Sequence, residues 1–372
     1  MTPLQHACFK GSLEMVELLL AMGSNVNSND HKMGYTALMF ASLSGNENVI
    51  IKLLNSGAKT HYTNSVGRTA SQMAAFIGNH RTATIINNYI ERPNIAHFAI
   101  PTGVMKEVRL QPSLVNAVHN LINEINFAPV KICLTLRNEY LIANWKTIVN
   151  VLDILCRQNF EPHNTNEGLS IKFHLISVVC SKAGAAYENG DKNLEKFIQV
   201  LLNGIGRDGL PEGQEKLLRQ ALKEFIFLES QLYRIIISEL HKVTIGNHPT
   251  ALEILSNRIN GQIFFRNPDD KLECSTCFAY NFTNKKCAAC SQVAYCNSDC
   301  QKIHWFTHKK YCKTFQGFKT ESMTDERGDE SLNIKQLQFI LNYLFYLESE
   351  ILREKIPDDD KPGNDDREEN EN

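Results

Sequence analysis

The sequence predicts a mostly α-helical protein made of several parts, and three observations lead to this prediction. A helix–turn–helix pattern recurs about every 33 residues over residues 1–91, and apolar residues follow helical spacing over residues 113–270. Seven of the eleven cysteines lie between Cys274 and Cys312, in spacings typical of a metal site. We therefore expect an N-terminal solenoid, a helical middle region and a small metal-bound module, followed by an acidic C-terminal tail.

The repeat begins three times with threonine and alanine in the same places. Residues 2–7 read TPLQHA, residues 36–41 read TALMFA and residues 69–74 read TASQMA, and a glycine follows each start. This pattern resembles the ankyrin repeat, in which two short helices cover their apolar faces only when the next copy stacks on them. The resemblance implies an ankyrin-repeat solenoid of three copies over residues 1–91.

The two ends of this array differ in their polarity. The first copy begins at residue 2 without a preceding hairpin or a polar capping repeat, so we expect a shortened isoform or an early start site. The last helix carries Thr82, Thr84, Asn87 and Asn88, which are polar as expected of a C-terminal cap.

Three prolines within residues 92–112 predict a linker between the repeats and the middle region. Residues 113–270 have the apolar spacing of helices, which predicts a helical scaffold without defining its fold. The chain contains no phosphate-binding, dinucleotide-binding, nucleophile-elbow or zinc-protease motif. His248, in the sequence IGNHPT, is interpreted as a turn residue rather than a catalytic base.

Residues 313–372 are expected to form a polar segment, an amphipathic helix near residues 332–353 and a tail. Residues 358–372 carry eight acidic and two basic side chains. Because such a composition cannot bury enough apolar surface, the tail is predicted to be disordered.

The cysteine-rich segment, residues 274–312, offers nine candidate ligands for the eight places of two tetrahedral zinc sites. They are seven cysteines, in two C-x2-C pairs, one C-x3-C pair and a final cysteine, together with His304 and His308. Thiolates bind zinc better than imidazole, so one histidine must be left over. Both histidines lie at helical spacing from a cysteine, so spacing alone does not decide, although His308 lies one turn before Cys312.

This segment closely resembles the MYND zinc finger. With the repeats in front of it, the chain resembles the ankyrin-repeat and MYND-domain protein 2 family over nearly its whole length. Alternate ligand pairs share a metal in MYND fingers, and the resemblance leaves His304 out of both sites. It implies that one zinc is held by Cys274, Cys277, Cys296 and Cys300, and the other by Cys287, Cys290, His308 and Cys312.

The two zinc ions are predicted to be structural. Cys300 and His308 are eight residues apart, which is about 12 Å along a helix, whereas two-metal catalysis needs ions about 4 Å apart. Each site is filled by four protein ligands, while a catalytic zinc keeps one position open. Zinc binding is therefore expected to stabilise a module whose core is too small to fold alone.

Gln301 and Trp305 are four residues apart and share a helix face that is turned away from the ligands. In the MYND family the matching glutamine and tryptophan line a groove for short proline-containing peptides. The resemblance therefore implies an extended peptide beside the short strand near residues 293–295, with a side chain against the indole. The family has a small polar residue at the position of Ala288, so one polar contact is expected to be absent. The alternative is that Trp305 packs the finger against the middle region.

The inner helices of the repeats supply a second predicted partner surface. Aligned on the ankyrin pattern, their variable positions are unusually apolar for a concave face, which is normally a partner surface. The predicted partner-binding residues there are Phe9, Phe40, Leu43, Met73 and Phe76. The alternative is that the middle region folds back over this face.

These features together predict a non-enzymatic, protein-binding adaptor. The balance of 39 basic and 41 acidic side chains gives no indication of a nucleic-acid partner, and we expect no signal peptide, no membrane span and a soluble, intracellular protein. The family resemblance implies a cytoplasmic and ciliary protein that assists the trafficking of signalling membrane proteins, with ciliary signalling or chaperone proteins as partners. A MYND-type transcriptional corepressor in the nucleus is the alternative. A SET-domain methyltransferase is disfavoured, because only 60 residues follow Cys312.

Overall fold

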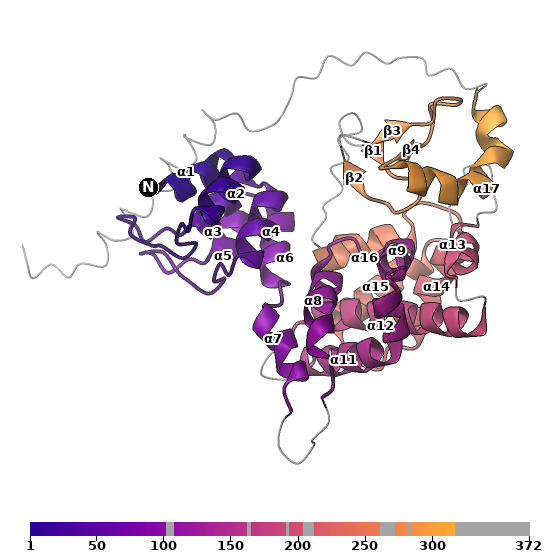
Figure 1. Ribbon diagram of the computed structural model, residues 1–372, viewed down its shortest axis with the longest axis horizontal. Helices are drawn as coiled ribbons and strands as arrows, with labels where there is room; N and C mark the ends of the chain where they lie inside the picture. Colours follow the sequence, from indigo (N-terminus) through magenta and orange to yellow (C-terminus); the bar gives the residue numbers. More distant parts are fainter. Residues whose placement is uncertain are drawn as a thin grey trace, which may run out of the picture. The chain divides into compact units, whose positions relative to one another are not determined.

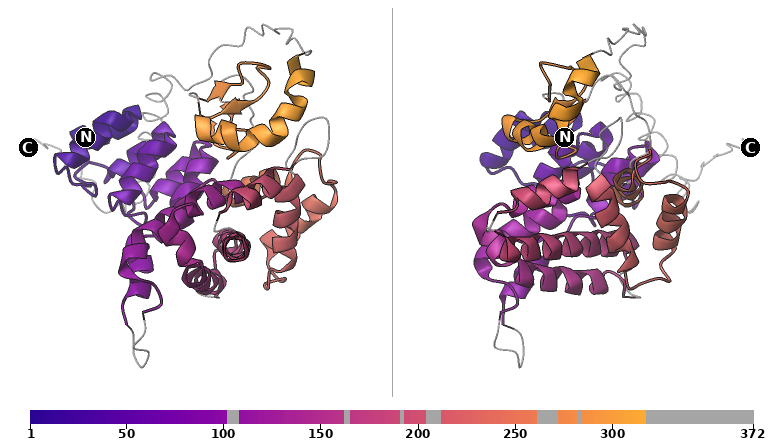
Figure 2. Two further views of the ribbon diagram at one scale, coloured as in Figure 1. Left: turned by 45° about the vertical axis from the view of Figure 1, so that its right-hand side comes forward. Right: turned by 90° about the vertical axis from the view of Figure 1, so that its right-hand side faces the viewer.

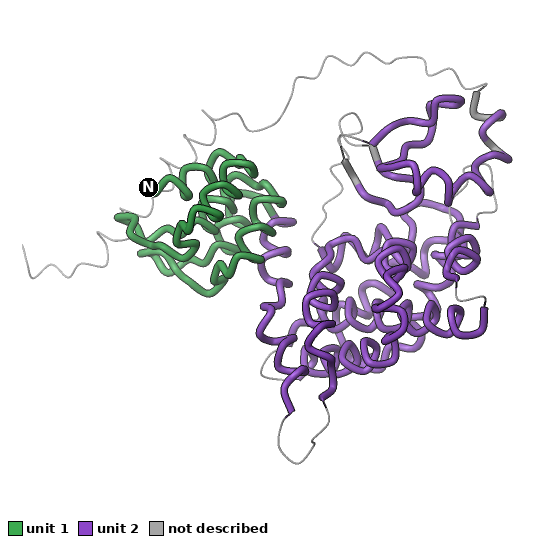
Figure 3. The backbone as a smooth tube through the Cα atoms, in the orientation of Figure 1, with its two compact units in different colours: residues 1–79, 325–372 green, residues 80–324 purple. Residues whose placement is uncertain are grey.

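The computed structural model describes residues 1–101, 108–161, 165–190, 193–203, 212–260, 272–281 and 284–316. These residues are mostly helical and fall into two compact units, one with described residues 1–79 and the other beginning at His80 (Figure 3). The amphipathic helix predicted near residues 332–353 and the acidic tail lie outside the described residues.

The first unit is a stack of helix pairs, as the repeat pattern predicts (Figure 1). Each inner helix begins at a threonine N-cap, because the hydroxyl groups of Thr2, Thr36 and Thr69 accept a hydrogen bond from the backbone N–H three residues on. The periodic threonine is therefore a helix start. The helices are α1 (Pro3–Lys10), α2 (Leu13–Ala21), α3 (Ala37–Ser44), α4 (Glu47–Asn55) and α5 (Ala70–Phe76).

Neighbouring copies are joined by side-chain amides at equivalent positions. Asn46 Nδ2 donates to the carbonyl of Gly11 (2.8 Å), and Asn79 Nδ2 donates to the carbonyl of Ser42 (3.1 Å). Gly45 has a φ of 71°, and a Cβ atom there would lie 2.9 Å from Asn79 Nδ2. The left-handed backbone favours glycine at all three repeated positions, and at Gly45 the approach of the next copy favours it as well.

The second unit contains the helical middle region. α12 is its central helix, and α9, α11, α14, α15 and α16 pack against it (Figure 2). The middle region consists of α6 (His80–Asn87), α7 (Arg92–Ala96), η1 (His97–Ala99), η2 (Pro112–Leu114), α8 (Val115–Asn123), α9 (Pro129–Leu136), α10 (Glu139–Ala143), α11 (Trp145–Gln158), α12 (Glu167–Asn189), α13 (Glu195–Leu202), α14 (Glu212–Lys223), α15 (Gln231–His241) and α16 (Ala251–Asn260).

α12 corrects one expectation about the membrane. By length and composition alone its 23 residues could cross a bilayer, contrary to the expectation that no apolar stretch approaches that length. However, 67% of its most apolar window is buried inside the protein. The apolar run is accounted for by its place as the core helix of the second unit.

Residues 92–112 were expected to form a linker, and the structure contradicts this for the part described. Ile95, Phe98 and Leu110 are buried in the core of the second unit, and α7 packs on α8. The prolines did not indicate a linker, because Pro93 and Pro112 lie in the first turn of α7 and η2, where proline costs no hydrogen bond.

The polar cap predicted on the third repeat is also wrong in part. Thr82 is buried, α6 packs against α16, and Asn88 Nδ2 donates to the carbonyl of Ile259 (2.9 Å). Thr82 and Asn88 are therefore buried or bonded within the second unit, whereas Asn87 is exposed as a polar cap requires.

A lysine side chain lies inside the second unit. Lys172, on α12, is only 3% exposed. Burial lowers the pKa of Lys172 from 10.5 to about 8, and the charge of Glu124 acts in the opposite direction. At any pH at which the amine is protonated, its burial therefore destabilises the folded protein, because the same charge is fully solvated in the unfolded chain.

We predict that Lys172→Met raises the free energy of unfolding by about 1–3 kcal/mol at pH 7. Between pH 8 and 10.5 the unfolded chain binds a proton at Lys172 that the native chain has lost, so the wild type gains stability as pH rises through this window. The advantage of the variant should consequently shrink at about pH 10, which thermal unfolding at both pH values measures. Lys182→Met, at an exposed position of the same helix, is the control. An advantage of the same size at both pH values would contradict the prediction.

Candidate metal centre

The finger consists of two short hairpins and one long helix. β1 (Leu272–Glu273) pairs with β2 (Tyr280–Asn281), β3 (Lys285–Lys286) pairs with β4 (Ala294–Tyr295), and α17 (Ser298–Gln316) follows. Each hairpin carries one C-x2-C pair in its turn. The sequence spacing thus places four thiols on two turns, and the remaining four ligands lie on or just before α17.

The two turns are built in the same way. The backbone N–H of Phe278 donates to the carbonyl of Cys274 (2.8 Å), and that of Ser291 donates to the carbonyl of Cys287 (2.9 Å). Phe278 and Ser291 have φ values of 60° and 57°. Residues other than glycine rarely adopt this left-handed backbone conformation, which costs roughly 1–2 kcal/mol. Something must offset this cost in each turn, and a metal bound by both thiols can do so.

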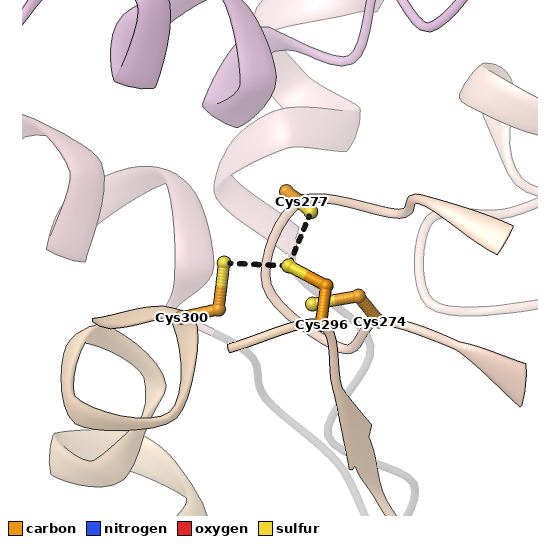
Figure 4. Close-up of side chains that lie close together, drawn as sticks. All are labelled: Cys274, Cys277, Cys296 and Cys300. Atoms are coloured by element: carbon orange, nitrogen blue, oxygen red, sulfur yellow. Dashed lines mark hydrogen bonds between the residues drawn. The ribbon is translucent and has the colours of Figure 1, made fainter. Parts of the chain in front are cut away.

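The first ligand group is Cys274, Cys277, Cys296 and Cys300, whose four Sγ atoms lie within 4.8 Å of one another (Figure 4). Cys277 Sγ is 3.7 Å from Cys296 Sγ, and Cys296 Sγ is 3.4 Å from Cys300 Sγ. Thiolates around a tetrahedral zinc, with Zn–S bonds of about 2.3 Å, are about 3.8 Å apart. The four thiols therefore fit a zinc ion.

The second ligand group is Cys287, Cys290, His308 and Cys312, again within 4.8 Å and buried. Cys290 Sγ lies 3.6 Å from His308 Nε2. A tetrahedral zinc with a thiolate at about 2.3 Å and an imidazole at about 2.0 Å places these atoms about 3.5 Å apart, close to the observed distance. The chemistry of both groups fits two structural zinc ions, each held by four protein ligands.

His304 belongs to neither group, although it is stacked on His308 with ring centroids 5.8 Å apart. Its Nδ1 lies 3.0 Å from the hydroxyl of Tyr295, which is itself buried. Burial lowers the pKa of His304 to about 4, with the neighbouring His308 acting in the same direction. His304 is therefore a neutral, hydrogen-bonded core residue between the two sites.

The thiols of the first group interact strongly with one another. Hydrogen bonds with the Cys277 and Cys300 thiols lower the pKa of Cys274, while the bonds with Cys274 and Cys277 raise the pKa of Cys300. Cys274 is thus stabilised as a thiolate, while Cys300 is held as a protonated thiol that donates to it. Zinc takes all four as thiolates, so its binding releases protons and orders both turns.

The finger is fastened to the helical middle region through a face of α17 that carries no ligand. Ile303 and Phe306 pack against the core of the second unit, and α17 lies against α13. Leu134, on α9, packs against the cysteine cluster. In addition, Asn126 Nδ2 donates to the carbonyl of Cys277 (2.7 Å). The middle region therefore fixes the backbone of a ligand of the first site.

Three polar residues that support the metal groups were not predicted from the sequence. Thr276 Oγ1 donates to the carbonyl of Cys300 (2.6 Å), and Asn297 Oδ1 accepts from the backbone N–H of Cys300 (2.8 Å). Asn297 has the position of a helix N-cap, a signal that could have been found. Thr276 and Asn126 give no sequence signal, because their partners lie 24 and 151 residues away.

Gln301 and Trp305 lie on a third face of α17, away from the middle region. Trp305 is 45% exposed and Gln301 is also exposed. The alternative in which Trp305 packs the finger against the middle region is wrong, because Ile303 and Phe306 do so instead. The strand expected beside the indole has no free edge at Ala294, which pairs with β3 on one side and with Cys274 on the other.

The predicted surface on the inner ankyrin helices is largely absent. Phe9, Phe40, Leu43 and Met73 are buried, and the ring of Phe40 packs against those of Phe9, Tyr35 and His31 inside the repeats. The buried positions therefore offer no exposed apolar surface to a partner. Phe76 is the exception: it is 52% exposed, with the guanidinium of Arg68 4.7 Å from its ring centroid.

A stack of short helix pairs and a two-zinc finger define a protein built from interaction modules, and sequence comparison identifies both. Residues 1–64 match ankyrin repeats in three copies, and residues 274–312 match the MYND finger. Dauer abnormal formation protein 25 of Caenorhabditis elegans is 30% identical over 336 residues, which cover 88% of this chain and 85% of that protein. The chain therefore belongs to the same family as Dauer abnormal formation protein 25.

Other known proteins share shorter segments with this chain. SET domain and MYND-type zinc finger protein 6 of Schizosaccharomyces pombe is 32% identical over 87 residues, which are 23% of this chain and 18% of that protein. Ankyrin repeat and SAM domain-containing protein 6 of Rattus norvegicus is 33% identical over 84 residues, 23% of this chain and 10% of that protein. The chain spans less than a fifth of each of these two relatives.

We predict that His308→Ala reduces the zinc content from two ions to one per chain, while His304→Ala retains both. Loss of His304 leaves the buried hydroxyl of Tyr295 without its partner, which should lower the free energy of unfolding by about 1–3 kcal/mol. Elemental analysis and thermal unfolding measure the two effects. Cys290→Ser should behave as His308→Ala does. A wild-type chain with one zinc ion, or loss of zinc from His304→Ala, would contradict the assignment.

We also predict that Asn126→Asp loosens the first metal group alone. The carboxylate introduced at this position would retain the acceptor used by the backbone N–H of Ala128 but lose the donor to the Cys277 carbonyl. Changes in groups that orient a ligand typically weaken metal binding about 10–100-fold. Cobalt substitution distinguishes a four-thiolate site from one with three thiolates and an imidazole. The four-thiolate spectrum should be lost about tenfold faster with a chelator, with no change in the other spectrum.

Proposed function

We propose that this protein is a non-enzymatic adaptor that binds other proteins through its ankyrin repeats and, in particular, through the exposed face of its MYND finger. The observation that carries this proposal is the position of Trp305, a large aromatic side chain that is 45% exposed. Its indole supplies no ligand atom and is not among the residues packed against the core of the second unit, although its ring lies edge-on to that of His308 with centroids 5.8 Å apart. Exposed aromatic residues of this kind dominate the binding energy of protein interfaces.

The ligand we propose for this face is a short, proline-containing peptide. A proline ring can lie flat on the indole, and the amide of Gln301, four residues earlier on α17, can bond to an extended backbone. Ala288 offers no hydroxyl, so the peptide has one polar contact fewer than the family pattern implies. A surface this small supports micromolar affinity, as is typical of transient adaptors.

We further propose that the chain is a member of the ankyrin-repeat and MYND-domain protein 2 family and that it acts in the cytoplasm and at the cilium. In this proposal it assists the trafficking of signalling membrane proteins, with ciliary signalling or chaperone proteins as partners. The support is the order of modules and an alignment over 85% of a single relative. No nucleic acid and no membrane insertion are needed for this role.

Two other functions have weaker support. Some relatives are named as enzymes, such as ubiquitin C-terminal hydrolase 15 of Oryza sativa, but the match covers 7% of that protein. A match this short gives little support for an enzymatic activity of this chain. A nuclear corepressor would bind peptides through the same exposed face of the finger, but no basic cluster resembling a nuclear signal favours a nuclear location.

We predict that Trp305→Ala removes a subset of partners while both zinc ions and the fold are retained, because the indole supplies no ligand atom and only packs beside the ring of His308. Proximity labelling in ciliated cells compares the wild type with Trp305→Ala and with the control Leu228→Ala, which removes an exposed apolar side chain from the middle region. Phe76→Ala tests the repeats in the same way. If Trp305→Ala leaves the set of labelled proteins unchanged, the proposal that the Trp305 face binds peptides is wrong. If the set changes but contains no ciliary proteins, only the proposed ciliary role is wrong.

A further inference from the structure

The exposed face of α17 is basic as well as aromatic. Lys302 lies three residues before Trp305 and Lys309 lies four residues after it, so both amines share the face of the indole. Lys302 and Lys309 are exposed, as are Lys310 and Lys313 further along the helix. Trp305 is thus flanked by a positive charge on each side along the helix axis.

These charges are not neutralised locally. In the described part of the finger, no ion pair involves Lys302 or Lys309, and Asp299 is the only acidic residue of α17. Asp299 lies in the first turn, ahead of Lys302. A ligand placed on the indole therefore meets two ammonium groups, neither of them in an ion pair with a described residue, within about 6 Å of Trp305 along the axis.

We propose that the Trp305 face selects an acidic peptide of a partner protein, one in which carboxylates flank the residue that lies on the indole. This inference rests on the proposed function and names the chemistry of the ligand. The apolar contact supplies affinity, while Lys302 and Lys309 supply the preference for aspartate or glutamate and speed the encounter. A proline-containing peptide without acidic neighbours binds the same face more weakly.

A protein ligand fits this face better than a nucleic acid. Seven thiolates and two zinc ions together contribute a charge of minus three to the finger, so its net charge stays small in spite of the lysines. Nucleic-acid binding depends on many phosphate contacts over an extended basic surface, whereas a short acidic peptide needs two. A single exposed aromatic ring likewise gives stacking for one residue only.

The test uses the full-length, zinc-loaded protein and three labelled probe peptides with one Pro-Leu core. The core is flanked by three aspartates, three asparagines or three lysines, and binding is followed by fluorescence anisotropy. We expect the aspartate probe to bind about tenfold more tightly than the asparagine probe at low salt, with the difference shrinking at about 0.5 M salt. The lysine probe should bind weakest.

A charge exchange locates the effect on α17. The double variant Lys302→Glu, Lys309→Glu should reverse the order, so that the lysine probe binds more tightly than the aspartate probe. The control Lys223→Glu, Lys242→Glu changes the net charge equally at exposed positions of the middle region and should leave the order unchanged. Equal binding of all three probes to the wild type, or the same reversal in the control, would overturn the proposal. Tighter binding of a single-stranded oligonucleotide than of the aspartate probe would also overturn it.

Two further measurements separate the sources of failure. Residues 356–360 of this chain read Ile-Pro-Asp-Asp-Asp, so the titration is repeated with Asp358, Asp359 and Asp360 changed to asparagine. Much tighter probe binding to that variant would assign the face to the chain's own tail and overturn an outside partner. If all probes bind equally but Trp305→Ala abolishes their binding, the charge preference is wrong and the peptide groove of the proposed function stands. If Trp305→Ala leaves binding unchanged, both are wrong.

Discussion

The finger depends on bonds between zinc and the side chains of one helix. Both hairpin turns contain a residue held in the left-handed region, and among the described residues each hairpin pairs two residues of each strand. A module of this size has little apolar area to bury, so cross-linking by metal replaces a core. Cys300 ties the first turn to α17, and Cys312 ties the second, so the helix is the element to which both sites are anchored.

α17 serves three purposes at once because its faces are divided among them. One face carries ligands, a second packs Ile303 and Phe306 against the middle region, and the third leaves Trp305 and its neighbouring lysines in solvent. Docking of the second face removes the freedom of the helix to turn. The exposed face is therefore presented at a fixed angle, which lowers the entropy that a weakly bound peptide must overcome.

The sequence predicted the elements whose chemistry is local. Threonine caps, the glycine after each inner helix and the cysteine spacings are each set by neighbours within a few residues, so the repeats and the nine candidate ligands could be found from the pattern. The division of the ligands into two groups, with His308 and without His304, came from the resemblance to MYND fingers. Features that depend on partners distant in sequence were missed. Asn126 is hydrogen-bonded to Cys277, 151 residues further along the chain. Ile95 and Phe98 belong to the core, although the prolines of their segment had predicted a linker. The prediction of a partner surface on the inner ankyrin helices was wrong for a related reason. Periodicity shows which residues share a helix face, but it does not show what covers that face.

The division of α17 into three faces constrains how its sequence can vary. Replacing a residue on the solvent face changes one contact, so that face is free to differ between relatives that bind different peptides. Adding or deleting a residue between Cys300 and Cys312 rotates everything beyond it by about 100°. Such a change would move His308 and Cys312 off their site and, at the same time, carry lysines toward the core. Among relatives, the length of this interval should therefore be invariant even where the side chains that read the partner have diverged.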